Sequence, residues 1–123
     1  MKRRNLLFAP LAAPLLLAQD DGFTGTPLVR IEADGTEAKR LEISAEAGSK
    51  AQCRIEKKGR GYIWASRDNR ELMRSNAGDW TYFVSPDGSG YVKILKNADG
   101  PFDYLEHVTS EFKTYTYWGR RTG

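Results

Sequence analysis

Apolar and polar residues alternate one by one along most of this 123-residue chain. In the segment 41–47, for example, Leu41, Ile43 and Ala45 alternate with polar residues. A repeat of two places successive side chains on opposite faces of a β-strand, whereas a helix repeats every 3.6 residues. Residues that favour turns, mainly Gly, Asp and Asn, lie between the alternating segments. The pattern predicts an all-β protein.

We predict about nine short strands joined by turns, a spacing typical of a sandwich or a small barrel. The segment Pro-Asp-Gly-Ser-Gly at 86–90 is the strongest turn signal, and the weak helical turn expected at 37–40 is the one helix predicted outside the first eighteen residues. The expected strands cover residues 28–33, 41–47, 51–56, 62–66, a short stretch around 72–73, 80–85, 91–95, 104–109 and 113–118.

The first eighteen residues have the layout of an export signal. Lys2, Arg3 and Arg4 precede an uncharged apolar run, and small residues before Gln19 offer a cleavage site. The apolar run is shorter than the roughly 20 residues that a membrane-spanning helix needs. We therefore expect a signal peptide at 1–18, a flexible lead-in at 19–26, one β-domain at 27–119 and a tail at 120–123, located in the periplasm or outside the cell. The arginine pair also resembles the twin-arginine export motif, so both export routes stay open.

Removing this leader changes the charge of the chain. Three of the 19 Lys and Arg residues lie in it and none of the 16 Asp and Glu residues does, which leaves 16 of each. A neutral mature chain lacks the overall positive charge that supplies most non-specific affinity for nucleic acid. We therefore expect no nucleic-acid partner and no membrane anchor after cleavage, and a monomer or weak homo-oligomer.

Part of the chain resembles an immunoglobulin-like domain. Cys53 and Trp64 are spaced like the strand-B cysteine and strand-C tryptophan of that family, and the segment 76–82 is similar to its Asp-x-Gly-x-Tyr-x-Cys motif, with Asn76, Trp80 and Tyr82 at the marked positions. The second cysteine is absent. The resemblance implies an immunoglobulin-like antiparallel β-sandwich of about seven to nine strands. Short turns between successive strands equally suit a small up-and-down β-barrel, which is the alternative.

A second resemblance is to small exported bacterial β-proteins to which no activity is assigned. It rests on the run from Trp64 to Leu72 and on the run from Pro86 to Val92. It implies a secreted β-domain and points to no reaction.

Candidate catalytic and metal-binding residues are few. The single cysteine, Cys53, falls on the apolar face of its strand, which predicts a buried thiol. The single histidine, His107, alternates with Glu106, so this carboxylate points away from it and is not expected to orient the ring. Asp and Asn residues near 20–21 and 97–103 lack the ordered spacing of a calcium loop. We expect no cofactor, no metal and no catalytic site.

Aromatic residues are the feature that remains. Thirteen of the 14 follow the leader, and in 80–84 and 115–118 they fall on both faces of a strand. One face can pack in the core, and the other then meets solvent, a partner or a ligand such as a sugar ring. The predicted binding face consists of Trp80, Tyr82, Tyr115 and Tyr117, with Arg67, Arg70 and Arg74 beside them.

The sequence therefore predicts an exported, non-catalytic binding or structural module that recognises an unidentified protein or carbohydrate. One alternative is a subunit of an envelope assembly, formed when an exposed edge strand pairs with another chain. The other is a small hydrolase centred on His107.

Overall fold

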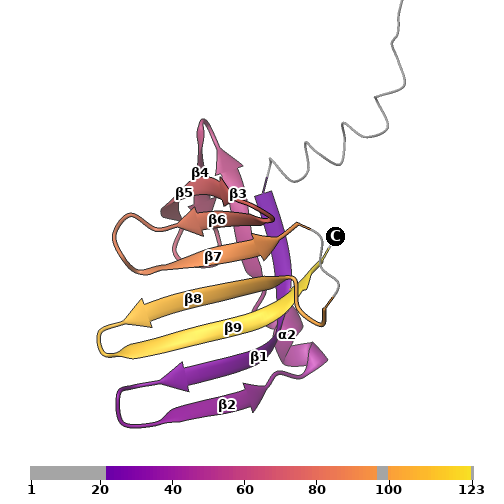
Figure 1. The fold of residues 1–123 in the computed structure, drawn as a ribbon, viewed down its shortest axis with the longest axis vertical. Coiled ribbons are helices and arrows are strands. Elements are labelled where there is room, and N and C mark those ends of the chain that lie inside the picture. The colour runs from indigo at the N-terminus through magenta and orange to yellow at the C-terminus, as the bar shows by residue number, and fades with distance from the viewer. Residues whose placement is uncertain (1–21, 97–99, 123) are drawn as a thin grey trace, which may run out of the picture.

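The computed structural model describes residues 22–96 and 100–122, and these form nine strands and one short helix (Figure 1). The predicted signal peptide lies outside the described residues. The elements are β1 (Gly22–Ala33), β2 (Ala38–Glu42), α2 (Ala45–Lys50), β3 (Cys53–Lys58), β4 (Gly61–Trp64), β5 (Arg70–Ala77), β6 (Trp80–Val84), β7 (Gly90–Leu95), β8 (Tyr104–Ser110) and β9 (Lys113–Arg121).

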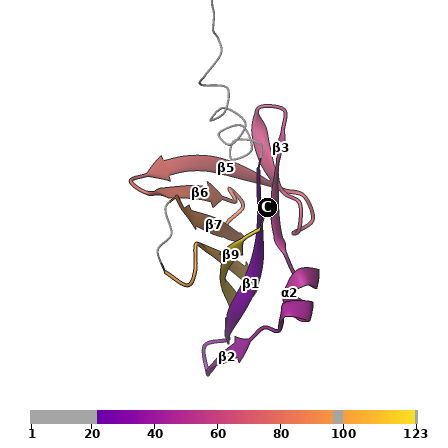
Figure 2. The same ribbon diagram turned by 90° about the vertical axis from the view of Figure 1, so that its right-hand side faces the viewer.

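The strands form one antiparallel sheet that closes in a ring (Figures 1 and 2). From β3 to β9 each strand pairs with the next one along the chain, as expected when short turns join alternating segments. The ring closes because β9 pairs with β1, and β1 pairs in turn with β3. The all-β prediction is confirmed.

The long strand β1 changes partners along its length. Its first residues, Gly22 to Gly25, pair with β3, whereas Val29 to Ala33 pair with β2 on the same edge. The register with β9 shifts between Pro27 and Val29, which marks a β-bulge. The sheet therefore forks at this bulge, and α2 lies beside the fork (Figure 2).

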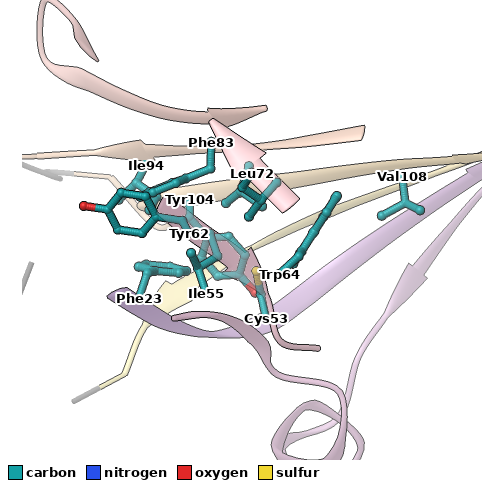
Figure 3. Packing of buried hydrophobic residues seen from close by; sticks show 11 residues of the cluster. Phe23, Cys53, Ile55, Tyr62, Trp64, Leu72, Phe83, Ile94, Tyr104 and Val108 are labelled. Carbon is teal, nitrogen blue, oxygen red and sulfur yellow. The ribbon is translucent and has the colours of Figure 1, made fainter. Parts of the chain in front are cut away.

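The interior of the ring holds the core. Inward-facing side chains from seven strands form one cluster, in which Tyr62 packs edge-on against Phe83 and Phe23 packs edge-on against Tyr104 (Figure 3). Trp64 and Val92 are fully buried. The alternation read from the sequence thus predicts the buried face of β3, including the buried Cys53.

The segment 37–50 differs from the prediction. A strand at 41–47 with Leu41, Ile43 and Ala45 inward is wrong, because the strand is β2 and Leu41 and Ala45 are exposed. The helical turn expected at 37–40 is wrong as well, because residues 38–40 pair with β1.

A helix follows β2 because Ser44 caps it. The Ser44 hydroxyl accepts a hydrogen bond from the amide of Ala47 at 3.2 Å, while Glu46 in the first turn and Lys50 in the last match the helix dipole. The sequence signal was a single capping residue before the helix. A helix of six residues is too short for a helical repeat to show in the sequence. Strand β1 also begins at Gly22, so residues 22–26 of the expected lead-in belong to the sheet. Among the described residues, no helix has the length and apolar character to cross a bilayer.

Closure of the ring at β1 and β9 depends on the absence of a side chain at Gly119. A Cβ there would lie 2.2 Å from the Thr26 carbonyl oxygen and 2.6 Å from Cε1 of Tyr104. We expect Gly119→Ala to destabilise the protein by about 1–3 kcal/mol, the usual cost of overpacking. Urea unfolding should show a lower midpoint. The matched control is Gly61→Ala, where a Cβ has no neighbour within 4 Å, and its midpoint should hardly move. Equal midpoints for both variants would contradict this role of Gly119.

Candidate functional site

A buried carboxylate lies inside the ring. Glu106, on β8, is only 2% exposed. Its Oε2 accepts hydrogen bonds from Nε1 of Trp64 at 2.8 Å and from Nε of Arg67 at 3.1 Å. Its Oε1 accepts a further bond from a terminal nitrogen of Arg67 at 3.2 Å. The paired contact with Arg67 is the geometry in which a guanidinium holds a carboxylate most strongly.

The turn after β4 brings Arg67 to this position. The amides of Arg67 and Asn69 both donate to the Trp64 carbonyl, at 2.9 and 3.1 Å. Asp68 and Asn69 have positive φ angles of 58° and 56°, a conformation that Asp and Asn adopt more readily than most residues. The turn therefore folds the chain back, and Arg67 reaches inward to Glu106.

Tyr117 completes the cluster from β9. It lies directly opposite Glu106 in the β8–β9 register, so the two residues share a face of the sheet. The guanidinium carbon of Arg67 lies 5.3 Å from the centroid of the Tyr117 ring, within the range of a cation–π contact. Burial acts to lower the pKa of Arg67, but the hydrogen bonds and charge of Glu106 outweigh it and raise that pKa. The arginine is therefore a fixed cation.

Cys53 is a further neighbour of the same carboxylate. Burial raises the pKa of this thiol well above its ordinary value of 9.0, and the negative charge of Glu106 and a hydrogen bond to that carboxylate raise it further. Reactive cysteines have the opposite surroundings, with exposure and neighbouring cations that lower the pKa. Cys53 is therefore a protonated packing residue at neutral pH.

A depression opens above Arg67, between the end of α2, the start of β3 and the turn after β4. Its volume is about 490 Å³. The Arg67 side chain is 30% exposed, so the guanidinium that binds Glu106 inside also reaches this depression. Three basic side chains and one acidic side chain are among the residues that line it: Lys50, Gln52, Arg54, Arg67, Asp68 and Tyr117.

The predicted binding residues divide into two groups on opposite faces of the sheet. Tyr115 and Tyr117 face inward, since they lie opposite Val108 and Glu106, and Arg67 joins them. Arg70 and Arg74 are on the inward face too, opposite Trp64 and Phe83. The structure therefore brings Arg67 and Tyr117 together.

Trp80 and Tyr82 lie on the outer face of β6, because their neighbours Thr81 and Phe83 are the buried ones. The ammonium group of Lys93 on β7 lies 4.3 Å from the Trp80 ring centroid and 5.6 Å from that of Tyr82. The sequence could not place these two aromatics relative to Arg67. It shows which residues of a strand share a face, but only closure of the ring decides which face points inward.

Sequence reasoning missed the pairing of Glu106 with Trp64 and Arg67. The available signal was the alternation in 104–108, which places Glu106 on one face with the apolar Tyr104 and Val108. A carboxylate at a core position requires partners, since an unpaired buried charge costs several kcal/mol. The signal indicates that a partner exists but does not say which of the 16 Lys and Arg residues after the leader it is.

His107 lies on the outer face, and Glu106 points away from it, as predicted. Nδ1 of His107 is 2.9 Å from the Thr116 hydroxyl, and its ring stacks on Tyr91 with centroids 5.2 Å apart.

The candidate calcium positions at 20–21 and 97–99 lie outside the described residues, and Asp103 accepts a hydrogen bond from the amide of Arg121 at 2.6 Å. Within residues 22–96 and 100–122, no three His, Cys, Asp or Glu side chains gather in a way that could hold a metal.

Removal of one partner from the buried ion pair should be costly. We expect Glu106→Leu or Arg67→Leu alone to destabilise the protein by about 3 kcal/mol, because each leaves a charge without its partner. The double variant should lose less than the sum of the two, with a coupling of about 2 kcal/mol. Urea unfolding of the four proteins measures it. The exposed pair Arg54–Glu56 is the control, and its coupling should stay below about 1 kcal/mol. Additive losses at 67 and 106 would show that the pair is not coupled.

The buried thiol should make the protein less stable at alkaline pH. Below pH 9.0, the ordinary pKa, Cys53 is protonated in both folded and unfolded chains and stability is unaffected. Above it only the unfolded chain loses the proton, so stability should fall by up to about 1.4 kcal/mol per pH unit.

Urea unfolding across this range measures that slope, and Cys53→Ala should reduce it. Part of the slope should remain, because burial raises the pKa of Tyr104 as well. Unchanged slopes in the variant would contradict a buried, protonated thiol.

The comparisons with known proteins place the chain in no family: no family model, no curated protein and no solved structure matches it.

Proposed function

We propose that this protein is an exported, non-catalytic binding module and that the depression above Arg67 binds an acidic saccharide. The observation that carries the proposal is the position of Arg67. Its guanidinium is held from below by Glu106 and flanked by Tyr117, and part of it reaches the depression. A cation fixed before the ligand arrives loses little conformational entropy on binding, which favours affinity.

The charges around the depression favour an anionic ligand. Lys50, Arg54 and Arg67 line it, and Asp68 is the acidic residue among the lining side chains. Because Arg67 already uses Nε and one terminal nitrogen on Glu106, the exposed Lys50 and Arg54 supply most of the donors for a ligand carboxylate. Tyr117 adds an aromatic surface of the kind that packs against sugar rings. A sugar ring that bears a carboxylate meets both requirements.

The arrangement of the core supports a site at the fork and not deeper inside. We infer that the ring is a small up-and-down barrel, the alternative to the immunoglobulin-like sandwich, because its eight strands follow chain order and share one closed set of pairings. A barrel of about eight strands has just enough interior for its own side chains. Trp64, Phe83 and Tyr104 occupy that interior, so a ligand is left with the open depression.

The hydrolase alternative lacks a comparable observation. Its centre, His107, lies on the outer face against Thr116 and Tyr91, with the nearest carboxylate in sequence turned inward. Cys53 is buried and protonated. The binding function is therefore the one that the described residues support best.

An NMR titration with D-glucuronate, with D-glucose as the neutral control, tests the proposal. We expect millimolar glucuronate to shift the backbone amides of residues 50–54 and 65–68, and glucose to shift them far less. The double variant Lys50→Gln/Arg54→Gln keeps the buried ion pair intact and should weaken binding roughly threefold or more, the size expected for two exposed charges.

The matched control is Lys57→Gln/Lys58→Gln, which removes two exposed charges from the far end of the same strand. Its affinity for glucuronate should equal that of the unaltered protein. Absence of shifts with glucuronate, or equal weakening by the two double variants, would overturn the proposal.

A further inference from the structure

The free edge of β2 has the charge pattern of a strand that pairs with a second copy of itself. In the part of the chain that the structure describes, β2 pairs with β1 alone and ends the sheet (Figure 1). All five of its residues are exposed, so none of the described segments covers this edge. An uncovered edge presents unpaired N–H and C=O groups that another strand can bind.

Two hydrogen bonds show which backbone groups of β2 face outward. The amide of Ile43 donates to the carbonyl of Leu28 at 2.9 Å, and the amide of Asp34 donates to the carbonyl of Glu37 at 3.2 Å. In an antiparallel pair the residues that bond to the partner alternate with those that do not. Residues 37, 39, 41 and 43 therefore bond to β1, and the backbone groups of 38, 40 and 42 point to the open edge.

This alternation restricts how two copies of β2 can pair antiparallel. Residues directly opposite each other must have side chains on the same face. The twofold axis that relates the two copies therefore lies at the position of one residue, which faces its own copy, and not between two neighbouring residues. With the axis at Arg40, two arginines would oppose each other. With the axis at Leu41, each Arg40 lies opposite Glu42 of the second copy, and these are residues whose backbone groups point outward.

The register centred on Leu41 also brings together the two Leu41 side chains. Leu41 is 40% exposed, one of only a few large hydrophobic residues in the described chain with so much exposed surface. Charged residues on an edge strand usually prevent self-association. Here Arg40 and Glu42 carry opposite charges two positions apart, and they already form an ion pair within one chain. The register that brings the two Leu41 side chains together therefore also forms two Arg40–Glu42 pairs between the copies.

The edge is also held in place before any partner arrives. At the tip of the β1–β2 hairpin, Oδ1 of Asp34 accepts hydrogen bonds from the amides of Thr36 and Glu37, at 2.9 and 3.1 Å, and from the Thr36 hydroxyl at 2.8 Å. These bonds lower the pKa of Asp34 to about 2, so they persist throughout the neutral range. A strand fixed in this way has less entropy to lose on pairing.

We propose that two copies of this chain form a dimer through antiparallel pairing of their β2 strands, with each Arg40 opposite Glu42 of the other copy. The sheet then runs continuously from one copy into the next. The shared ladder is short, so the dimer forms at micromolar or higher concentrations. The proposal stands apart from the saccharide site, because it concerns a different edge and a different measurement.

Sedimentation velocity over a range of protein concentrations tests the dimer. We expect the unaltered protein to pass from monomer to dimer as concentration rises. Glu42→Arg and Arg40→Glu should each raise the dissociation constant about tenfold or more, because each places like charges opposite each other. The double variant Arg40→Glu/Glu42→Arg restores opposite charges in the same register and should recover the dimer.

Mixing the two single variants gives a sharper test. A chain with two arginines at 40 and 42 is complementary to a chain with two glutamates there, so the mixture should form a heterodimer although neither variant dimerises alone. The matched control is Glu56→Arg, which alters an exposed Arg–Glu pair on β3, a strand whose two edges are both paired.

This control should leave dimerisation unchanged. A monomer at every concentration, or a dimer that is indifferent to all the β2 variants, would overturn the proposal. Heterodimer formation in the mixture would confirm both the edge and its register.

Discussion

The contact of Glu106 with Arg67 and Trp64 ties together parts of the chain that are far apart in sequence. Trp64 ends β4, Arg67 lies in the turn that follows, and Glu106 belongs to β8 on the far side of the ring. Closing the ring buries Glu106, and a buried carboxylate without partners would cost several kcal/mol. The hydrogen bonds from Trp64 and Arg67 offset that cost. The contact therefore joins β4 and β8 across the ring.

The partner exchange of β1 is the second constraint. Because β1 leaves β3 after Gly25 and pairs with β2 from Val29, the sheet forks, and the two surface features on which the proposals rest lie near this fork. On one side of the fork the depression exposes part of Arg67. On the other side β2 forms an edge without a neighbouring strand among the described residues. One bulge in one strand thus separates the proposed ligand site from the proposed assembly edge.

Local sequence patterns predicted the strands well where one face is buried. In β6, β7 and β8 the turns between the strands carry clear signals, so the bounds of the strands follow from the residues. In β6 aromatic residues fall on both faces, so the pattern leaves open which face is buried. The pattern failed at 41–47, where Leu41 and Ile43 alternate with polar residues although β2 lies at an edge and buries no side chain. Alternation shows which side chains share a face of a strand, but that face is buried only where another part of the protein packs against it.

The candidate site shows the same division. The sequence by itself determined the all-β class, the buried position of Cys53 and the placement of Glu106 and His107 on opposite faces of one strand, because a repeat of two depends on local backbone geometry alone. It also supplied Arg67 and Tyr117 as candidates. Only the tertiary structure decided that these two residues meet over Glu106 while Trp80 and Tyr82 lie on the opposite face. The physical reason is that contacts across the ring depend on the closure of the sheet, which joins β9 to β1 over long separations that no local pattern encodes.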